Sequence, residues 1–126
     1  ETFDFLGFTH YCSKSVKGRF RVKRKTSGKK FKSKVKEFKE WLKAVRHQDE
    51  KELMKTIRAK LIGHYHYYGI TDNSRALSVF KFQITKVLFK WLNRRSQRRS
   101  FTYDKFNLFL KRNPLPEPKI YVNIYS

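Results

Sequence analysis

Two pairs of side chains stand two residues apart and could do chemistry. His10 and Cys12 share one face of a strand-like segment, where an imidazole could activate a thiol, but no neighbouring residue would orient that base. His64 and His66 resemble a pair of metal ligands. They lie in a helical pattern, however, where the directions of side chains two positions apart differ by about 200° around the axis. We therefore expect His64 to point inward and be hydrogen-bonded, His66 to be exposed, and neither pair to form a catalytic or metal site.

The carboxylates are too scattered for phosphoryl-transfer chemistry. The chain has 10 acidic residues, and Asp72 is the only one between Glu52 and Asp104. A two-metal site needs clustered carboxylates, and neither a glycine-rich phosphate loop, nor a GxSxG elbow, nor an HExxH motif is present. The single cysteine excludes an internal disulfide and a cysteine-based zinc cluster. The sequence indicates a binding module without catalytic residues, metal or cofactor of its own.

The charge predicts a polyanionic partner. There are 31 lysines and arginines in 126 residues, which gives a net charge of +21. Nucleic acid is the favoured partner, because displacing counterions from phosphates rewards dense positive charge. A membrane surface is the other option, but no apolar run approaches bilayer-spanning length and no signal peptide is visible. A reducing, cytoplasmic setting fits the single cysteine.

A basic flank runs along the first predicted helix, which extends from Ser27-Gly28 to about His47. Its buried stripe has helical spacing and comprises Phe31, Val35, Phe38, Leu42 and Val45. The basic flank lies a quarter-turn or more from this stripe and comprises Lys29, Lys32, Lys36, Lys39 and Lys43. Such a flank could be only a solvated face, but five lysines without an interleaved acid favour phosphate contact.

Two further helices are predicted, and the second of them is also basic. One is capped by Asp49 with Glu52 in capping-box position and stops at Gly69. Its apolar stripe comprises Leu53, Ile57, Leu61 and Tyr68, widened by Met54 and Tyr65. The next helix runs from Ser74 to about Asn93, with an apolar stripe of Leu77, Phe80, Ile84, Val87, Leu88 and Trp91. Opposite this stripe lie Arg75, Lys86, Lys90 and Arg94. An arginine cluster continues past its end with Arg95, Arg98 and Arg99. Phe82 and Phe89 could stack on bases, although contact with another helix is favoured.

The remaining elements complete the fold. Two strand-like runs, FDFLGFTHYC and RFRVKRKT, flank a glycine-containing connector and predict a hairpin. A short helix is expected from Thr102 or Tyr103 to about Arg112, before a proline-containing tail whose last residues alternate like a strand. We predict a mainly α fold with an N-terminal β-hairpin (1–26), three principal helices plus a short fourth (27–113), and an extended C-terminal tail (114–126).

Several of these blocks resemble one protein family. The run from Phe3 to Lys32 is similar to the end of the palm in bacterial group II intron reverse transcriptases, with Phe5, Leu6 and Gly7 resembling their primer grip. The later blocks resemble the maturase-specific domain, which is the polymerase thumb: KEFKEWLK, LIGHYHYYGITDNSRALSVF, FKWLNRRSQRRSFTYDKFNLFL and NPLPEPKIYV. The sequence departs from the family pattern at Ile62, where arginine is expected, and at His66, where asparagine is common.

The resemblance implies a larger parent protein and two functions for this part of it. Fingers and palm, with the catalytic aspartates and their magnesium, would lie upstream of Glu1, so the chain alone should be inactive. The thumb would grip the template-primer duplex during DNA synthesis and bind intron RNA in its splicing-competent fold. A bacterial, cytoplasmic location follows from the same resemblance.

A second function class stays open from the residues alone. The chain could be a free-standing basic RNA- or DNA-binding protein, a split or degenerate remnant with no polymerase role. An upstream Tyr-Ala-Asp-Asp-type motif in the same reading frame would favour the reverse transcriptase, and a start codon just before Glu1 would favour the remnant.

Overall fold

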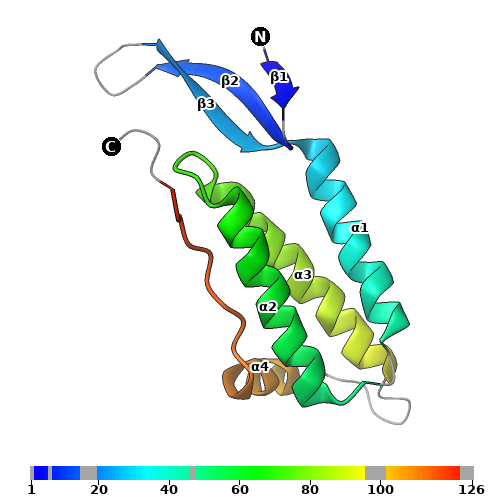
Figure 1. Ribbon diagram of the computed structural model, residues 1–126. Helices are drawn as coiled ribbons and strands as arrows, with labels where there is room; N and C mark the ends of the chain where they lie inside the picture. Colours follow the sequence, from blue (N-terminus) through cyan, green and yellow to red (C-terminus); the bar gives the residue numbers. More distant parts are fainter. Residues whose placement is uncertain (1, 6, 15–19, 46–47, 96–101, 123–126) are drawn as a thin grey trace.

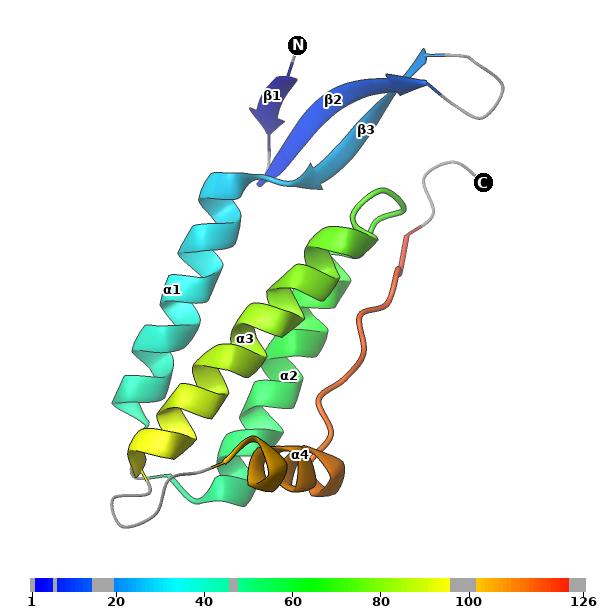
Figure 2. The ribbon, with the colours of Figure 1, turned by 180° about the vertical axis from the view of Figure 1, so that it is seen from behind.

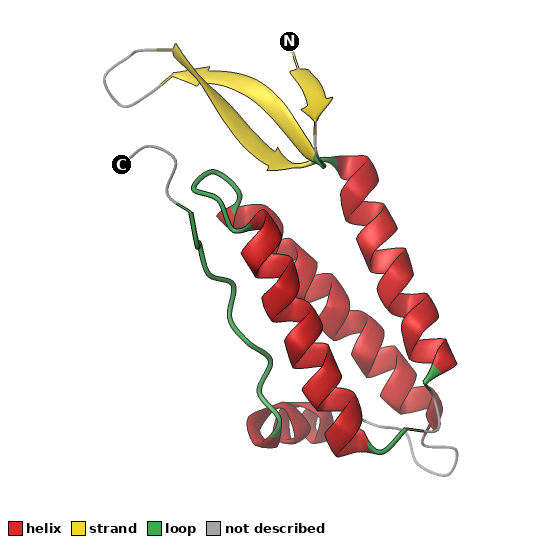
Figure 3. Cartoon of the chain, viewed as in Figure 1, coloured by secondary structure: helices red, strands yellow, loops and turns green. Residues whose placement is uncertain are grey.

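A small β-sheet leads into four helices and an extended tail (Figures 1 and 3). The computed structural model describes residues 2–5, 7–14, 20–45, 48–95 and 102–122. The predicted fold class is confirmed: the chain is mainly α, with an N-terminal hairpin before the helices. None of the helices in these ranges combines the length and the apolar character that crossing a membrane requires.

The sheet has one strand more than predicted. Strand β1 (Thr2–Phe5) pairs with β2 (Phe8–Lys14), and β2 pairs with β3 (Phe20–Thr26), both antiparallel. The prediction of one continuous first strand was wrong, because Gly7 has a φ of 84° and the chain reverses there. A residue with a side chain rarely adopts such a φ, so glycine permits the reversal. The predicted hairpin is the β2–β3 pair.

Helix α1 (Gly28–Ala44) begins at a side-chain cap. The Ser27 hydroxyl accepts a hydrogen bond from the Lys30 amide at 3.1 Å, which satisfies one of the amides left unpaired in the first turn. Phe38 and Leu42 are buried, and Phe31, Val35 and Val45 pack against the same core, as predicted. The helix ends at Ala44, earlier than the predicted end near His47, which itself lies outside the described residues.

Helix α2 (Glu50–Tyr68) supplies the largest share of the core. Its predicted stripe is buried along its whole length: Leu53, Met54, Ile57, Leu61, Tyr65 and Tyr68. Asp49 occupies the cap position and Gly69 the stop, as expected. The predicted capping box is wrong in one respect, since the Asp49 side chain makes no capping hydrogen bond.

Helix α3 (Ser74–Arg95) is the central helix of the bundle. Leu77, Phe80, Ile84 and Leu88 are buried as predicted, whereas Trp91 is only partly buried. Leu92, which the predicted stripe omitted, is buried instead. Helix α4 (Tyr103–Arg112) is capped by Thr102, whose hydroxyl accepts from the Lys105 amide at 3.3 Å, and it buries Phe106.

The described part of the tail is extended, as predicted, and the second half of its strand-like run, residues 123–126, lies outside the described residues. Residues 114–122 run back alongside α2 (Figure 1). Ile70, just after the end of α2, and Val122 form an isolated parallel bridge. The Gly69 carbonyl accepts from the amides of Tyr121 at 2.8 Å and Val122 at 3.0 Å. A Cβ at Gly69 would clash with the Tyr65 and Lys119 carbonyls, so the close approach of the tail requires glycine there.

The three long helices are not equally close to one another. Both α1 and α2 pack more closely against α3 than against each other. Figure 2 shows α1 and α3 side by side in front, with α2 behind α3. A groove lies between α1 and α2, with Phe80 and Ile84 of α3 at its floor.

Candidate nucleic-acid interface

The predicted basic flank of α1 is accessible. Lys29, Lys32, Lys36, Lys39 and Lys43 are all exposed, and none of them forms an ion pair with a described residue. Glu37 pairs with Lys34 at 3.4 Å on a different side of the helix. These five ammonium groups are therefore available to phosphates.

The predicted basic face of α3 is accessible as well. Arg75, Lys86, Lys90 and Arg94 are exposed, opposite the buried stripe. The Lys86 ammonium lies 5.4 Å from the centre of the Phe82 ring, close enough for a cation–π contact. The arginine cluster cannot be added to this face: Arg98 and Arg99 lie outside the described residues, and of Arg95 only the backbone, as the last residue of α3, is described.

The two basic sets belong to one side of the molecule. On α1 the lysine flank lies about 180° around the helix from Lys30 and Lys34, which face α2. On α3 the basic face lies opposite the buried stripe, whose Phe80 and Ile84 face the cavity between α1 and α2. Because α1 and α3 are neighbours, the helical positions of both sets direct them away from α2. We call this the outer basic face.

The aromatic pair on α3 divides into two different environments. Phe89 stacks on Tyr103 at 4.6 Å and packs on Phe106 at 5.1 Å, so the favoured contact with another helix is confirmed for this ring. Phe82 is 59% exposed and borders a second hollow beneath the tail. Of these two rings, Phe82 is the one that a base could reach.

The primer-grip-like segment meets the helices at Gly7. The Gly7 carbonyl accepts a hydrogen bond from the Ser27 amide at 2.9 Å, and a Cβ at Gly7 would lie 3.0 Å from the Tyr68 hydroxyl. Leu6 lies outside the described residues, as does the side chain of Phe5. Sequence reasoning missed Asn73, which joins the same two regions. It accepts from the Thr26 amide at 2.7 Å and donates to the Tyr68 carbonyl at 2.9 Å.

The predicted burial of His64 and exposure of His66 are confirmed, whereas His64 contacts its described neighbours by ring stacking and not by the predicted hydrogen bond. His64 is buried and stacks on Phe80 with ring centres 3.7 Å apart, while His66 is exposed and stacks on Tyr121 at 3.8 Å. Burial, and secondarily the Lys34 charge, lowers the pKa of His64 to about 4, so the ring is neutral at pH 7. No group of three histidine, cysteine or carboxylate side chains in the described part of the chain could hold a metal.

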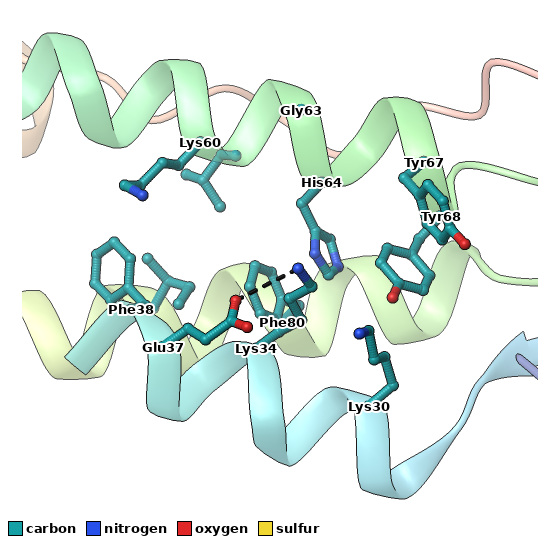
Figure 4. A pocket seen from close by; sticks show the side chains of 12 residues that line it. Lys30, Lys34, Glu37, Phe38, Lys60, Gly63, His64, Tyr67, Tyr68 and Phe80 are labelled. Carbon is teal, nitrogen blue, oxygen red and sulfur yellow. Dashed lines mark hydrogen bonds and ion pairs between the residues drawn. The ribbon is translucent and has the colours of Figure 1, made fainter. Parts of the chain in front are cut away.

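Sequence reasoning also missed a cavity of about 500 Å³ between α1 and α2 (Figure 4). Lys30 and Lys34 line one wall and Lys60 and Tyr67 the other, with Phe80 of α3 at the floor. The spacing of Lys30 and Lys34, four residues apart and off the main lysine flank, was a signal for it. The departure at Ile62 lies outside this lining, and its side chain is exposed.

Comparison with known proteins assigns a family. Residues 28–108 match the family model of the group II intron, maturase-specific domain, from the first residue of α1 into α4. No curated protein and no solved structure gave a significant match. The matched segment covers well over half of the chain and includes both helices of the outer basic face. This chain belongs to the group II intron maturase-specific domain family.

Proposed function

We propose that this chain is the nucleic-acid-binding thumb of a bacterial, cytoplasmic group II intron reverse transcriptase. In this function it grips the template-primer duplex during DNA synthesis and binds intron RNA to promote splicing and mobility. Family membership supports the link to the intron. The outer basic face is the observation that carries the RNA contact, since nine exposed cations on two adjacent helices have no carboxylate partner among the described residues.

The outer basic face suits a duplex backbone. Phosphate contacts add affinity without sequence preference, and each contributes close to one unit of salt dependence on a duplex. An A-form RNA duplex presents a wide minor groove with 2′-hydroxyls, which a helix such as α3 could follow by shape. The same cations would serve a template-primer duplex and a paired region of the intron.

The catalytic part of this proposal lies outside the chain. The described residues contain no carboxylate cluster for magnesium, so fingers and palm of the parent enzyme would supply both the aspartates and the metal. We expect the purified chain alone to bind a primed template without extending it. DNA synthesis by a sample free of longer enzyme would contradict this assignment.

The binding test reverses charge on the outer basic face. Lys86→Glu combined with Lys90→Glu should weaken binding to all duplexes alike and flatten the slope of log K against log salt. Glu37→Lys with Glu40→Lys is the matched control, since it changes the net charge by the same amount in the opposite direction and should do little harm. Filter binding over a salt series measures both quantities.

A different result would indicate that RNA binding depends on stacking of bases on aromatic rings and not on phosphate contacts. If the double reversal left the salt slope unchanged while Phe82→Ala with Phe89→Ala abolished binding, the outer basic face would not be the binding surface. Phe89 packs on α4, so the single change Phe82→Ala separates a lost contact from a damaged fold.

A further inference from the structure

The cavity between α1 and α2 opens on the side of the bundle opposite the outer basic face. Because α1 and α2 both pack against α3, Phe80 and Ile84 of α3 form the floor of the space between them (Figure 4). Its volume of about 500 Å³ lies within the range of small-molecule sites. The lysines of the outer basic face do not line it.

The walls of the cavity carry an excess of positive charge. Lys30 and Lys34 enter from α1 and Lys60 from α2, against one carboxylate, that of Glu37. Glu37 is engaged with Lys34 at 3.4 Å, while Lys30 and Lys60 form no ion pair with a described residue. The Lys60 ammonium rests 4.8 Å from the centre of the Trp41 ring. Lys60 therefore lies at the Trp41 end of the cavity and Lys30 at the Tyr68 end (Figure 4). Lys30 is the ammonium group on the same end as Tyr67, and an ammonium group without a carboxylate partner suits a phosphate.

One wall presents an accessible aromatic ring. Tyr67 is 56% exposed, although its neighbours in the sequence, His66 excepted, are largely buried. It contacts Tyr68 at 4.6 Å and lies nearly parallel to Phe8 at 6.1 Å, so its orientation is fixed by packing. A ring held in this way is a platform for a base.

The inner end of the cavity holds a polar atom without a hydrogen-bond partner. The Tyr68 hydroxyl is buried and unpaired among the described residues, close to Gly7. Burial raises the pKa of Tyr68 to about 12, so the hydroxyl keeps its proton and remains a donor. An unpaired buried hydroxyl is costly, and a ligand acceptor that reaches this end of the cavity would satisfy it.

We propose that this cavity binds one unpaired nucleotide of an RNA, with its base on Tyr67 and its phosphate on Lys30. The base must be unpaired, because paired bases are stacked on both faces and a duplex is too wide for the groove. This inference rests on the proposed RNA binding and adds a second contact, on the opposite side of the bundle from the duplex.

The test uses a fluorescent base to report on the cavity. The probes are a perfect RNA hairpin and the same hairpin with a single bulged 2-aminopurine. Binding of the bulged hairpin to the wild-type chain should quench the fluorescence as the base stacks. Tyr67→Ala should abolish the quench and weaken bulge binding roughly 5- to 100-fold, the range for one stacked base, while leaving the perfect hairpin unaffected. Tyr67→Trp should restore both.

Matched controls separate the cavity from general aromatic and charge effects. Phe82→Ala removes a ring that is equally exposed on α3 and should leave the quench intact. Lys30→Ala should weaken bulge binding, whereas Lys36→Ala, at a lysine of the outer basic face, should weaken binding of the perfect hairpin.

The outcomes distinguish this inference from the proposed function. If the wild-type chain bound neither hairpin, the proposed RNA binding itself would fail. If it bound both with the expected salt dependence, but Tyr67→Ala left the quench and the bulge affinity unchanged, only the nucleotide site would be overturned. The cavity would then be left to a different occupant, such as a segment of protein.

Discussion

Among single residues, His64 combines burial, ring stacking and a nearby cation. Its pKa is about 4 in the folded protein, below the ordinary 6.5. Between these two values the unfolded state binds more protons than the folded state, so stability is fully present above pH 6.5 and declines as the pH falls toward 4. We expect His64 to remove about 2–3 kcal/mol of stability between pH 7 and pH 4.5.

Urea unfolding at these two pH values checks the expectation. His64→Phe keeps a flat ring between Phe80 and Tyr68 but cannot titrate, so the variant should lose clearly less stability than the wild type on acidification. Carboxylates titrate in both proteins and cancel in the comparison. An identical pH dependence in the two proteins would show that His64 is protonated without cost in the fold.

Asn73 is a residue whose role depends on contacts far away in the sequence. Asn73 is fully buried, and its side chain makes three hydrogen bonds. The side-chain oxygen accepts from the Thr26 amide, and the side-chain nitrogen donates to the Thr26 hydroxyl at 2.7 Å and to the Tyr68 carbonyl. Asn73→Ala would leave the partners of these bonds buried and unpaired, at about 1–3 kcal/mol for each unsatisfied group.

We therefore expect Asn73→Ala to lower the free energy of unfolding by at least about 2 kcal/mol, measured by urea titration. Asn107→Ala is the matched control, because Asn107 is exposed on α4 and its loss should change stability by less than about 0.5 kcal/mol. Equal effects of the two substitutions would mean that water replaces the lost bonds at position 73.

At the scale of elements, the buried stripes of the helices decide which substitutions are costly. Phe38 is buried between α1 and the rest of the core, so Phe38→Ala should cost about 3–5 kcal/mol. Trp91 lies at the margin of the core and keeps part of its surface in water, so Trp91→Ala should cost distinctly less. Thermal melts of both variants test this order, and a larger loss at Trp91 would contradict the packing described for α3.

The same elements show what the sequence could predict and what it could not. The helix positions followed from local information, because apolar spacing, caps such as Ser27 and stops such as Gly69 act within a few residues. The split between β1 and β2 was missed because the reversal depends on the backbone of Gly7, within an otherwise continuous apolar run. The described part of the tail pairs at one bridge, since alternation alone does not supply a partner strand.

The candidate surfaces divide in the same way. Exposure of the lysines on α1 and of the cations on α3 could be predicted, because it depends only on the angle from each helix's own apolar stripe. The cavity could not, because it exists only when α1 and α2 are placed on the same helix, α3. Asn73 looked like one of several capping residues, and its bonds to Thr26 span 47 positions of the chain.

At the scale of the whole molecule, the bundle separates the two proposed RNA contacts. The outer basic face lies on α1 and α3, and the proposed nucleotide site lies between α1 and α2 on the other side. Residues far apart, with no shared partner, contribute independently to binding energy, to within about 0.5 kcal/mol. One maturase domain could thus hold a paired and an unpaired region of RNA together.

We expect the two proposed sites to bind RNA independently of each other. An excess of the perfect hairpin should saturate the outer basic face yet leave the quench of a bulged 2-aminopurine hairpin largely intact, because the two RNAs occupy different surfaces. Lys86→Glu with Lys90→Glu should likewise flatten the salt dependence for the perfect hairpin without abolishing the quench. Competition titrations followed by fluorescence measure both effects. Full displacement of the bulged hairpin by the perfect one would mean that the molecule has one RNA surface, shared by both contacts.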